Sequence, residues 1–161
     1  MSKNVLVTYF SATGTTARLA KTLAEAADAE LAEIVPAEPY TAADLNWNDS
    51  RSRSSVEMKG DRSYRPAIAE TVANMDDYDV VYVGFPIWWY VAPTIVNTFL
   101  EAHDLTGKTV VPFATSGGSG MGSTNTELAP SCPGARLLAG KRFSASTSAQ
   151  DLRAWIDTLD L

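Results

Sequence analysis

The chain has 161 residues, of which 45% are hydrophobic, and its formal net charge is −6. This size suits a sizeable single core, so we expect residues 1–161 to form one domain. The acidic balance argues against nucleic acid or an anionic membrane as a partner. Cys132 is the only cysteine, which excludes an intrachain disulfide, a cysteine-rich zinc site and a cysteine-ligated iron–sulfur cluster. The first residues lack the apolar core of a signal peptide, and we therefore expect a cytoplasmic protein.

The first predicted elements are a strand, a hydroxyl-rich turn and a helix. Val5–Phe10 is mostly apolar and rich in β-branched and aromatic residues, as buried strands are. In residues 17–27, apolar side chains recur at helical spacing. Between these elements, the turn Ser11–Thr16 holds four hydroxyl side chains and Gly14.

Such a turn can bind an anion, because the first N–H groups of a helix lack partners and lie at the positive end of the helix dipole. The plainer alternative is a helix cap made by serine or threonine. Four hydroxyls and a glycine in six residues exceed what a cap needs, which favours an anion site. The signatures of ATP-binding and dinucleotide-binding loops are both absent from this turn.

A strand and a long connection come next. Glu30–Val35 alternates apolar and polar residues, which predicts a strand near the sheet edge. The connection that follows, about 36–65, looks irregular and carries five basic residues: Arg51, Arg53, Lys59, Arg62 and Arg65. Connections this long are usually functional or mobile, and the sequence leaves open a solvated loop or a segment that covers a cofactor or docks a partner. Pro66 then suits the first turn of a helix predicted over 66–73.

Residues 80–100 contain no charged side chain and form a run long enough to span a bilayer. Pro86 and Pro93 interrupt this run, however. We therefore predict a third strand, Val80–Phe85, a loop, and a helix over Thr94–Ala102, rather than a membrane span.

The remaining predicted elements are a strand over 109–115, a short helix that Ser123 begins, a strand over 135–138 and a helix over 149–159. Strands that alternate with helices predict a parallel sheet covered on both faces. Right-handed crossovers and this size favour a doubly wound, three-layer α/β/α fold with five strands in the order 2-1-3-4-5. In that order, the turn Ser11–Thr16 and the loop after Phe85 meet at the switch point between strands one and three.

Two further loops follow predicted strands at this edge. The loop after strand three begins Pro86, Ile87, Trp88, Trp89, and its aromatic rings offer a planar ligand a stacking surface; the alternative is core packing. The loop Thr115–Gly120 is nearly free of side chains and can present N–H groups to a ligand edge; the alternative is a flexible surface loop. Neither loop contains lysine or arginine, so we expect dipoles to compensate ligand charge.

The turn Ser11-Ala-Thr-Gly-Thr-Thr16 resembles the phosphate-binding loop of flavodoxins, which reads roughly T/S-x-T-G-x-T. With its Pro-Ile-Trp-Trp and Thr-Ser-Gly-Gly-Ser-Gly loops, the chain resembles short bacterial flavodoxin-like proteins that bind flavin mononucleotide (FMN). The resemblance implies phosphate contacts from Ser11, Ala12, Thr13, Gly14, Thr15 and Thr16. It implies contacts to the flavin ring from Pro86, Ile87, Trp88, Trp89, Thr115, Ser116, Gly117, Gly118, Ser119 and Gly120. Carrier flavodoxins place a tyrosine in the third loop; here, a tryptophan of the second loop or nothing covers that flavin face.

In this resemblance the flavin carries the chemistry, so we expect no catalytic side chain and no metal. One reading is a redox protein, monomeric or homodimeric, that passes electrons between protein partners through FMN. The alternative is an FMN oxidoreductase that takes hydride from NAD(P)H and reduces a quinone or a similar small acceptor. A third reading is a binding module that uses the fold without flavin. His103, the only histidine, follows a helix, and nothing places it near a nucleophile, which disfavours a Ser-His-Asp hydrolase.

Overall fold

A parallel β-sheet forms the centre of the molecule. The computed structural model describes residues 4–46, 48–59, 64–88, 91–116, 120–122, 124–159 and 161, with Lys59 described by its backbone only. The strands pair in the order β2-β1-β3-β4-β5, and β6 also pairs with β4, all in parallel. This order confirms the predicted doubly wound fold. The strands are β1 (Val5–Tyr9), β2 (Glu30–Glu33), β3 (Val80–Pro86), β4 (Thr109–Thr115), β5 (Arg136–Leu137) and β6 (Lys141–Phe143).

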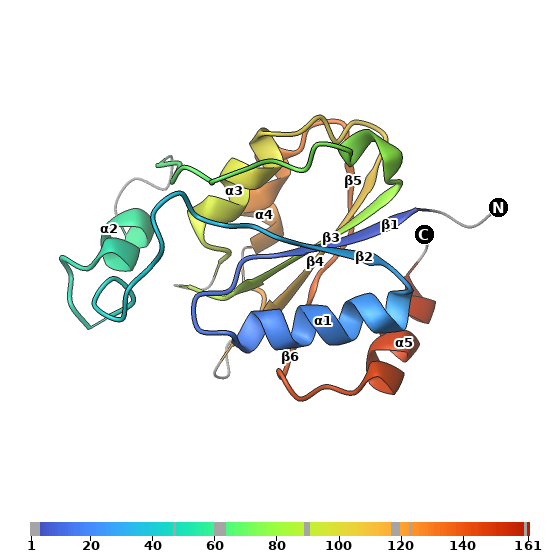
Figure 1. The fold of residues 1–161 in the computed structure, drawn as a ribbon, viewed down its shortest axis with the longest axis horizontal. Coiled ribbons are helices and arrows are strands. Elements are labelled where there is room, and N and C mark those ends of the chain that lie inside the picture. The colour runs from blue at the N-terminus through green and yellow to red at the C-terminus, as the bar shows by residue number, and fades with distance from the viewer. Residues whose placement is uncertain are drawn as a thin grey trace.

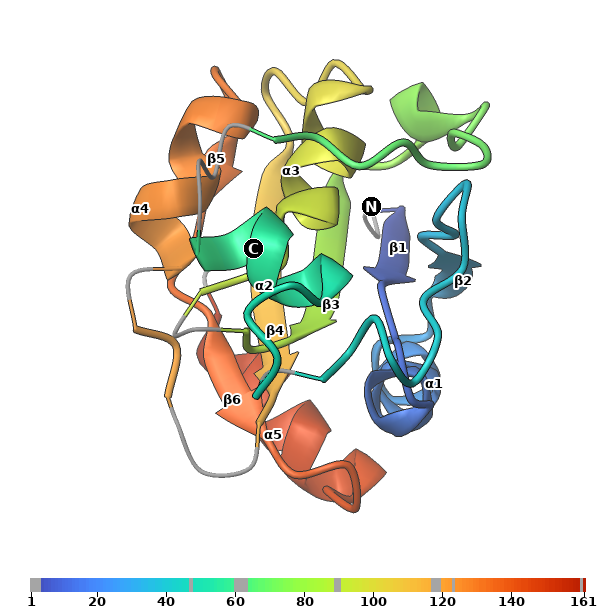
Figure 2. The same ribbon diagram turned by 90° about the vertical axis from the view of Figure 1, so that its left-hand side faces the viewer.

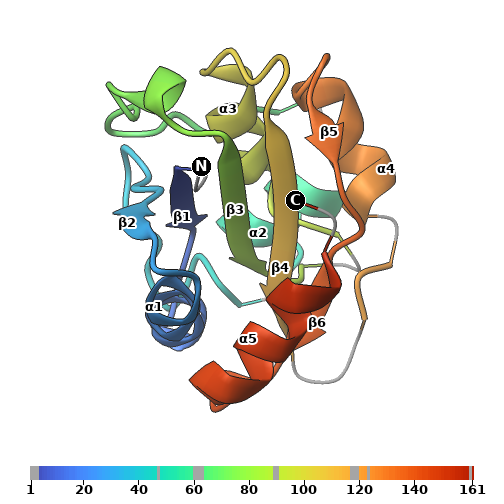
Figure 3. The ribbon, with the colours of Figure 1, turned by 90° about the vertical axis from the view of Figure 1, so that its right-hand side faces the viewer.

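Helices lie on both faces of the sheet. Helices α1 and α5 lie side by side on one face, and α3 and α4 cover the other (Figures 1 and 3). A further helix, α2, lies off the end of the sheet. The helices are α1 (Thr15–Ala27), α2 (Arg53–Lys59), α3 (Thr94–Glu101), α4 (Thr124–Leu128) and α5 (Ala149–Thr158), with 3₁₀ turns at Met75–Asp77 and Ala129–Ser131.

Two hydrophobic clusters, one on each face, hold the layers together. Successive side chains of a strand point to opposite faces, so Leu6 of β1 joins the cluster that contains Ile95 of α3. Its neighbour Val7 joins the other cluster with Leu19 of α1 and Trp155 of α5. All five side chains are buried. Both faces of the sheet are therefore covered, as predicted.

The uncharged run 80–100 divides between β3 and α3. Of its described apolar side chains, those of Val81, Val83, Ile95 and Phe99 lie in the core, whereas Ile87 and Trp88 are half-buried. Within the described part of the chain, no helix is long and apolar enough to cross a membrane.

The predicted strand 135–138 corresponds to β5, and β6, a further short strand that the sequence did not predict, pairs with β4 after it. In β5, Leu137 pairs with Val110, and in β6, Lys141 pairs with Phe113. Between them the ladder meets Pro112, which has no N–H to donate. Val110 O accepts a hydrogen bond from Leu138 N, just after β5. Pro112 lies two residues further along β4, so it faces the same neighbouring segment but cannot donate to it. The proline therefore explains why β5 and β6 are separate strands.

The predicted helix over 66–73 is wrong. The segment runs extended and forms an antiparallel bridge between Ile68 and Pro36. Ala69 N donates to Val35 O at 2.7 Å, and Val72 N donates to His103 Nε2 at 2.9 Å. The ring of His103 in turn lies with Nδ1 2.8 Å from Phe99 O. The N–H groups of this segment thus bond to other segments, and His103, at the end of α3 as expected, fixes the segment to the core.

The connection 36–65 was expected to be irregular, but it contains α2, which lies beyond the carboxyl ends of β3 and β4 (Figures 1 and 2). Ser52 begins this helix: its Oγ accepts Ser55 N at 3.4 Å and bonds to Ser55 Oγ at 3.0 Å. Serine at this position satisfies an N–H group that the first turn leaves open. Met58 is fully buried, so α2 packs against the rest of the protein.

Buried tyrosines predict loss of stability in alkaline solution. Tyr82 is 1% exposed, and burial raises the pKa of its phenol from 10.0 to about 12. Above pH 10 the unfolded chain ionises while the folded protein stays neutral, so stability falls as pH rises toward 12, by at most about 1.4 kcal/mol per pH unit for this group. Burial raises the pKa of Tyr40 as well. Urea unfolding at alkaline pH should show a smaller pH dependence for Tyr82→Phe than for wild type; an equal dependence contradicts this account.

Candidate cofactor site

The turn Ser11–Thr16 joins β1 to α1 and leaves the start of the helix open. Gly14 is the N-cap, with φ 92° and ψ −11°, and no described side chain caps the helix there. Gly14 N itself donates to Ser11 Oγ at 3.1 Å. The first backbone bond of the helix runs from Arg18 N to Gly14 O, so the preceding N–H groups have no partner within the helix. The hydroxyl oxygens of Thr13 and Thr15 are exposed and lie 3.3 Å apart.

The three loops that the sequence singled out meet at one edge of the sheet. Thr16 Oγ1 of the first lies 2.8 Å from Thr115 Oγ1 at the start of the third, and both residues are buried. Ile87 N of the second donates to Thr115 O at 2.9 Å. Phe10 N, just before the first turn, donates to Gly84 O at 2.8 Å. The carboxyl ends of β1, β3 and β4 thus lie together, where parallel sheets bind ligands.

Trp88 of the second loop is half-buried, and its ring contacts two other aromatic rings edge-on. Its centroid lies 5.7 Å from that of Phe10 and 5.4 Å from that of Tyr40. Trp88 N also donates to Val91 O at 2.9 Å, which closes the loop on itself. Of the other predicted site residues, Trp89, Gly117, Gly118 and Ser119 lie outside the described residues, and Gly120 is exposed.

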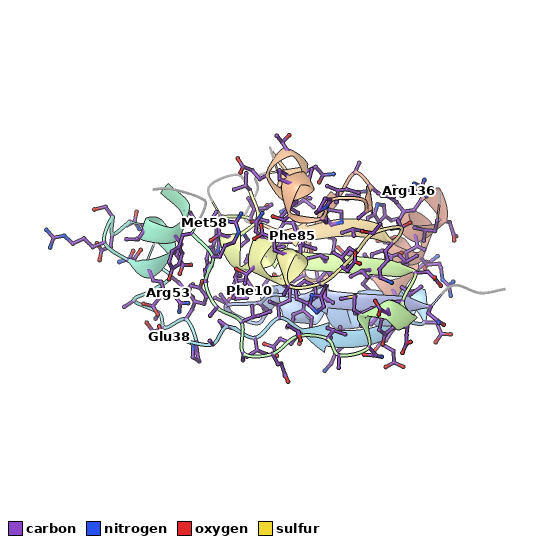
Figure 4. All side chains as sticks on the ribbon, turned by 90° about the horizontal axis from the view of Figure 1, so that it is seen from above. Phe10, Glu38, Arg53, Met58, Phe85 and Arg136 are labelled. Atoms are coloured by element: carbon purple, nitrogen blue, oxygen red, sulfur yellow. The ribbon has the colours of Figure 1, made fainter. Side chains whose placement is uncertain are left out.

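Tyr40, which was not predicted as a site residue from the sequence, attaches α2 to this site. Tyr40 Oη donates to Glu57 Oε1 at 2.5 Å, and Glu57 is 3% exposed. Arg53 Nε donates to Glu57 Oε2 at 2.8 Å, and the guanidinium carbon of Arg53 lies 3.8 Å from the centre of the Tyr40 ring. Arg53 also donates to Glu38 O at 2.7 Å; both residues lie at the α2 end in Figure 4. The only sequence signal was a tyrosine next to two prolines in a polar segment.

The five basic residues of 51–65 do not form a uniform cationic patch. Arg53 is paired with Glu57, and Arg65 Nε bonds Glu101 of α3 at 3.0 Å. This bond and the Ser131 hydroxyl lower the pKa of the Glu101 carboxyl. Arg51 is exposed, and neither Arg62 nor the side chain of Lys59 is among the described parts. At least two of these cations therefore anchor the segment to the protein.

A second residue that the sequence analysis missed is Arg142 of β6. Its Nε donates to Ser116 Oγ at 3.1 Å and its Nη2 to Ser116 O at 2.9 Å. Arg142 thus places a cation beside a loop at which mostly dipolar charge compensation was expected. The signal was weak because Arg142 lies 26 residues further along the chain, in a strand that the pattern did not reveal.

A cavity of about 270 Å³ borders the start of the first turn; its lining comprises Phe10, Ser11, Ala12, Glu33, Val35, Pro36, Pro39 and Tyr40. A larger hollow of about 630 Å³ lies at the opposite end of the sheet, beside Asn4, Asp28 and Asp77. The first of these lies at the carboxyl end of β1, the edge at which parallel sheets bind ligands, but of the predicted site residues it borders only Ser11 and Ala12.

The fold is that of a doubly wound α/β protein, and a hydroxyl-rich turn with an open helix start lies at its switch point. The chain belongs to the flavodoxin family, whose model matches residues 4–159. A crystallised protein of Bacteroides eggerthii DSM 20697, described as a candidate flavoprotein, is 51% identical over 99% of both chains, with a TM-score of 0.93. No curated protein matches the chain.

Two more distant structures share the fold. A flavoprotein of Lactobacillus acidophilus NCFM, crystallised in complex with FMN, is 21% identical over 88% of this chain and 93% of that chain, with a TM-score of 0.70. An NADH:FMN oxidoreductase in its apo form is 17% identical over 97% of this chain and 87% of that chain, with a TM-score of 0.56. Family membership confirms the resemblance seen in the sequence and supports FMN as the cofactor.

Proposed function

We propose that this chain is an FMN protein that passes electrons between redox partners through the bound flavin. The observation that carries the proposal is the meeting of three loops at Thr115, which bonds to Thr16 of the first loop and to Ile87 of the second. When bound, FMN supplies one-electron and hydride chemistry, and the protein supplies binding, orientation and electrostatics.

The first turn fits the phosphate of FMN. Gly14 leaves the start of α1 open, and a Cβ built on it would meet no described atom within 4 Å. A phosphate oxygen can therefore approach the backbone N–H groups and the positive end of the helix dipole. The exposed hydroxyls of Thr13 and Thr15 supply further donors. We assign the phosphate to Ser11, Ala12, Thr13, Gly14, Thr15 and Thr16.

The second and third loops are assigned to the ring. Ile87 and Trp88 already donate their backbone N–H groups to Thr115 O and Val91 O, and Pro86 has none. Trp88 O in turn accepts Val91 N. A carbonyl oxygen of Pro86 or Ile87 would pair with flavin N5 only when N5 is protonated, as it is after reduction, and such a pair would favour reduced flavin. The remaining assigned ring contacts are Trp89, Thr115, Ser116, Gly117, Gly118, Ser119 and Gly120.

A second candidate function is an FMN oxidoreductase that takes hydride from NAD(P)H and reduces a quinone or a similar acceptor. It is favoured by the third loop, which contains no aromatic side chain to cover the outer flavin face. An uncovered ring face is what a nicotinamide needs to approach the flavin. The shared fold of the apo NADH:FMN oxidoreductase is compatible with this role but does not establish it.

Anaerobic reduction of the FMN-loaded protein separates the two functions. A carrier should be reduced by dithionite through a detectable one-electron stage and should ignore NADH and NADPH in the absence of a reductase. Rapid bleaching of the flavin by either nucleotide, with turnover when a quinone is added, would establish the oxidoreductase instead. A protein that stays colourless with added FMN would exclude both.

Trp88 is expected to quench the fluorescence of bound FMN if its free face stacks on the ring. In Trp88→Ala at saturating FMN, flavin fluorescence should rise several-fold above that of the wild-type complex. Trp155→Phe is the control, because Trp155 of α5 packs against Tyr82 and Phe143 on the other side of the sheet from Trp88. Equal quenching in wild type and Trp88→Ala would move the stacking role to another side chain.

A further inference from the structure

Arg142 brings a positive charge to the third loop, although that loop contains no basic residue. The pairing of β6 with β4 aligns Arg142 with Ala114, two residues before Ser116. Two guanidinium nitrogens then bond the hydroxyl and the carbonyl oxygen of Ser116. Because arginine is planar and always charged, two bonds to one residue fix both the position and the orientation of the charge.

This charge is half-buried and has no acidic partner among the described residues. Arg53, by contrast, is paired with Glu57, and Arg65 is paired with Glu101. The contacts of Arg142 are both to Ser116, whose oxygens carry no net charge. A half-buried cation without a carboxylate is free to attract an anion from outside, and solvent screens it less than it screens an exposed charge.

The direction of the side chain separates Arg142 from the phosphate turn. Phe143, the next residue of β6, packs on Trp155 of α5, with ring centroids 4.9 Å apart. Thr115 likewise reaches Thr16 of α1. Side chains alternate along strands, so Arg142 and Ser116 belong to the opposite face, which α3 and α4 cover. The guanidinium therefore lies at the ring loop and not at the start of α1.

We propose that Arg142 stabilises the reduced, negatively charged flavin ring and so sets the redox preference of the bound cofactor. This inference rests on the proposed function. A fixed cation near a group that gains negative charge on reduction favours the reduced form, and it needs no rearrangement when the electrons arrive. Oxidised FMN has a neutral ring and gains less from the same charge.

The test compares dissociation constants for oxidised and reduced FMN, measured anaerobically with wild type, Arg142→Gln, Arg142→Lys and Arg136→Gln. Arg136 is the matched control: it pairs with β4 at Thr109 and lies at the opposite end of the sheet, as Figure 4 shows. Arg142→Gln should weaken the binding of reduced FMN about tenfold more than that of oxidised FMN, which lowers the midpoint potential by about 30 mV for a two-electron couple. Arg142→Lys and Arg136→Gln should keep most of the wild-type ratio.

Three other results of this comparison would overturn the inference. Equal weakening of oxidised and reduced FMN by Arg142→Gln, with riboflavin unaffected, would show that Arg142 serves the phosphate and would overturn the inference. The inference would also be overturned if Arg142→Gln left the ratio of the two dissociation constants unchanged, or if Arg142→Lys lost the wild-type ratio. In both cases, binding of FMN by wild type would leave the proposed function standing. Failure of wild type to bind FMN would overturn the function and this inference together.

Discussion

Gly14→Val should weaken FMN binding by about 100-fold or more. The valine side chain would project into the space in front of the first turn and exclude the phosphate from the N–H groups of α1. A hydrogen bond to a charged group contributes roughly 1.5–3 kcal/mol, so the loss of two such bonds is sufficient for an effect of this size. Fluorescence titration with FMN measures it directly.

Gly107→Val is the matched control for backbone strain. Gly107 has φ 79°, close to the 92° of Gly14, and a Cβ built on it also meets no described atom within 4 Å. It lies before β4, away from the ligand edge. Both variants should lose stability, because a left-handed conformation costs an L-residue roughly 1–2 kcal/mol. Only Gly14→Val should lose FMN affinity. If the two variants bind FMN alike, the phosphate assignment is wrong.

Gly84→Ala should lower the free energy of unfolding by about 3 kcal/mol. Gly84 of β3 pairs with Phe113 of β4, and an added Cβ would overlap the Phe113 ring. Phe113 is fully buried in the cluster under α1 and α5, so its ring has no free space to enter. Urea unfolding gives the free energy, and Gly120→Ala, where a Cβ meets no described atom, should change it little.

A double-mutant cycle identifies the cause of this loss. Phe113→Leu alone should destabilise the protein, because it removes buried ring atoms. In the Gly84→Ala background the same change should be much less harmful, because the smaller side chain makes room for the new methyl. The coupling between contacting residues is expected to be about 0.5–3 kcal/mol. Additive costs would show that the overlap with the ring is not what destabilises Gly84→Ala.

The elements that the sequence predicted well are those whose side-chain pattern and environment agree. Val80–Phe85 and 109–115 are mostly apolar because both faces of these central strands are buried. The strand order followed from the alternation of strands with helices. The phosphate-type turn was visible because glycine and hydroxyl residues are concentrated in six adjacent positions.

The failures share a physical cause, which is pairing between segments distant in sequence. Residues 66–73 are extended because Val35 and His103 accept their N–H groups, and no local pattern encodes such partners. The break between β5 and β6 depends on Pro112 in the neighbouring strand. Arg142 serves the third loop only because β6 pairs with β4. The turns themselves, which local sequence determines, were therefore predictable, whereas the contacts that Tyr40 and Arg142 make through tertiary structure were not.

The comparison of FMN with riboflavin tests the central claim most directly, since the two ligands share a ring and differ by the phosphate. Titration of the apo protein, followed by flavin fluorescence, should show a single FMN bound per chain and riboflavin bound at least about 100-fold more weakly, as expected when two or more charged hydrogen bonds are lost. Equal affinity for both ligands, or no binding of either, would contradict the account.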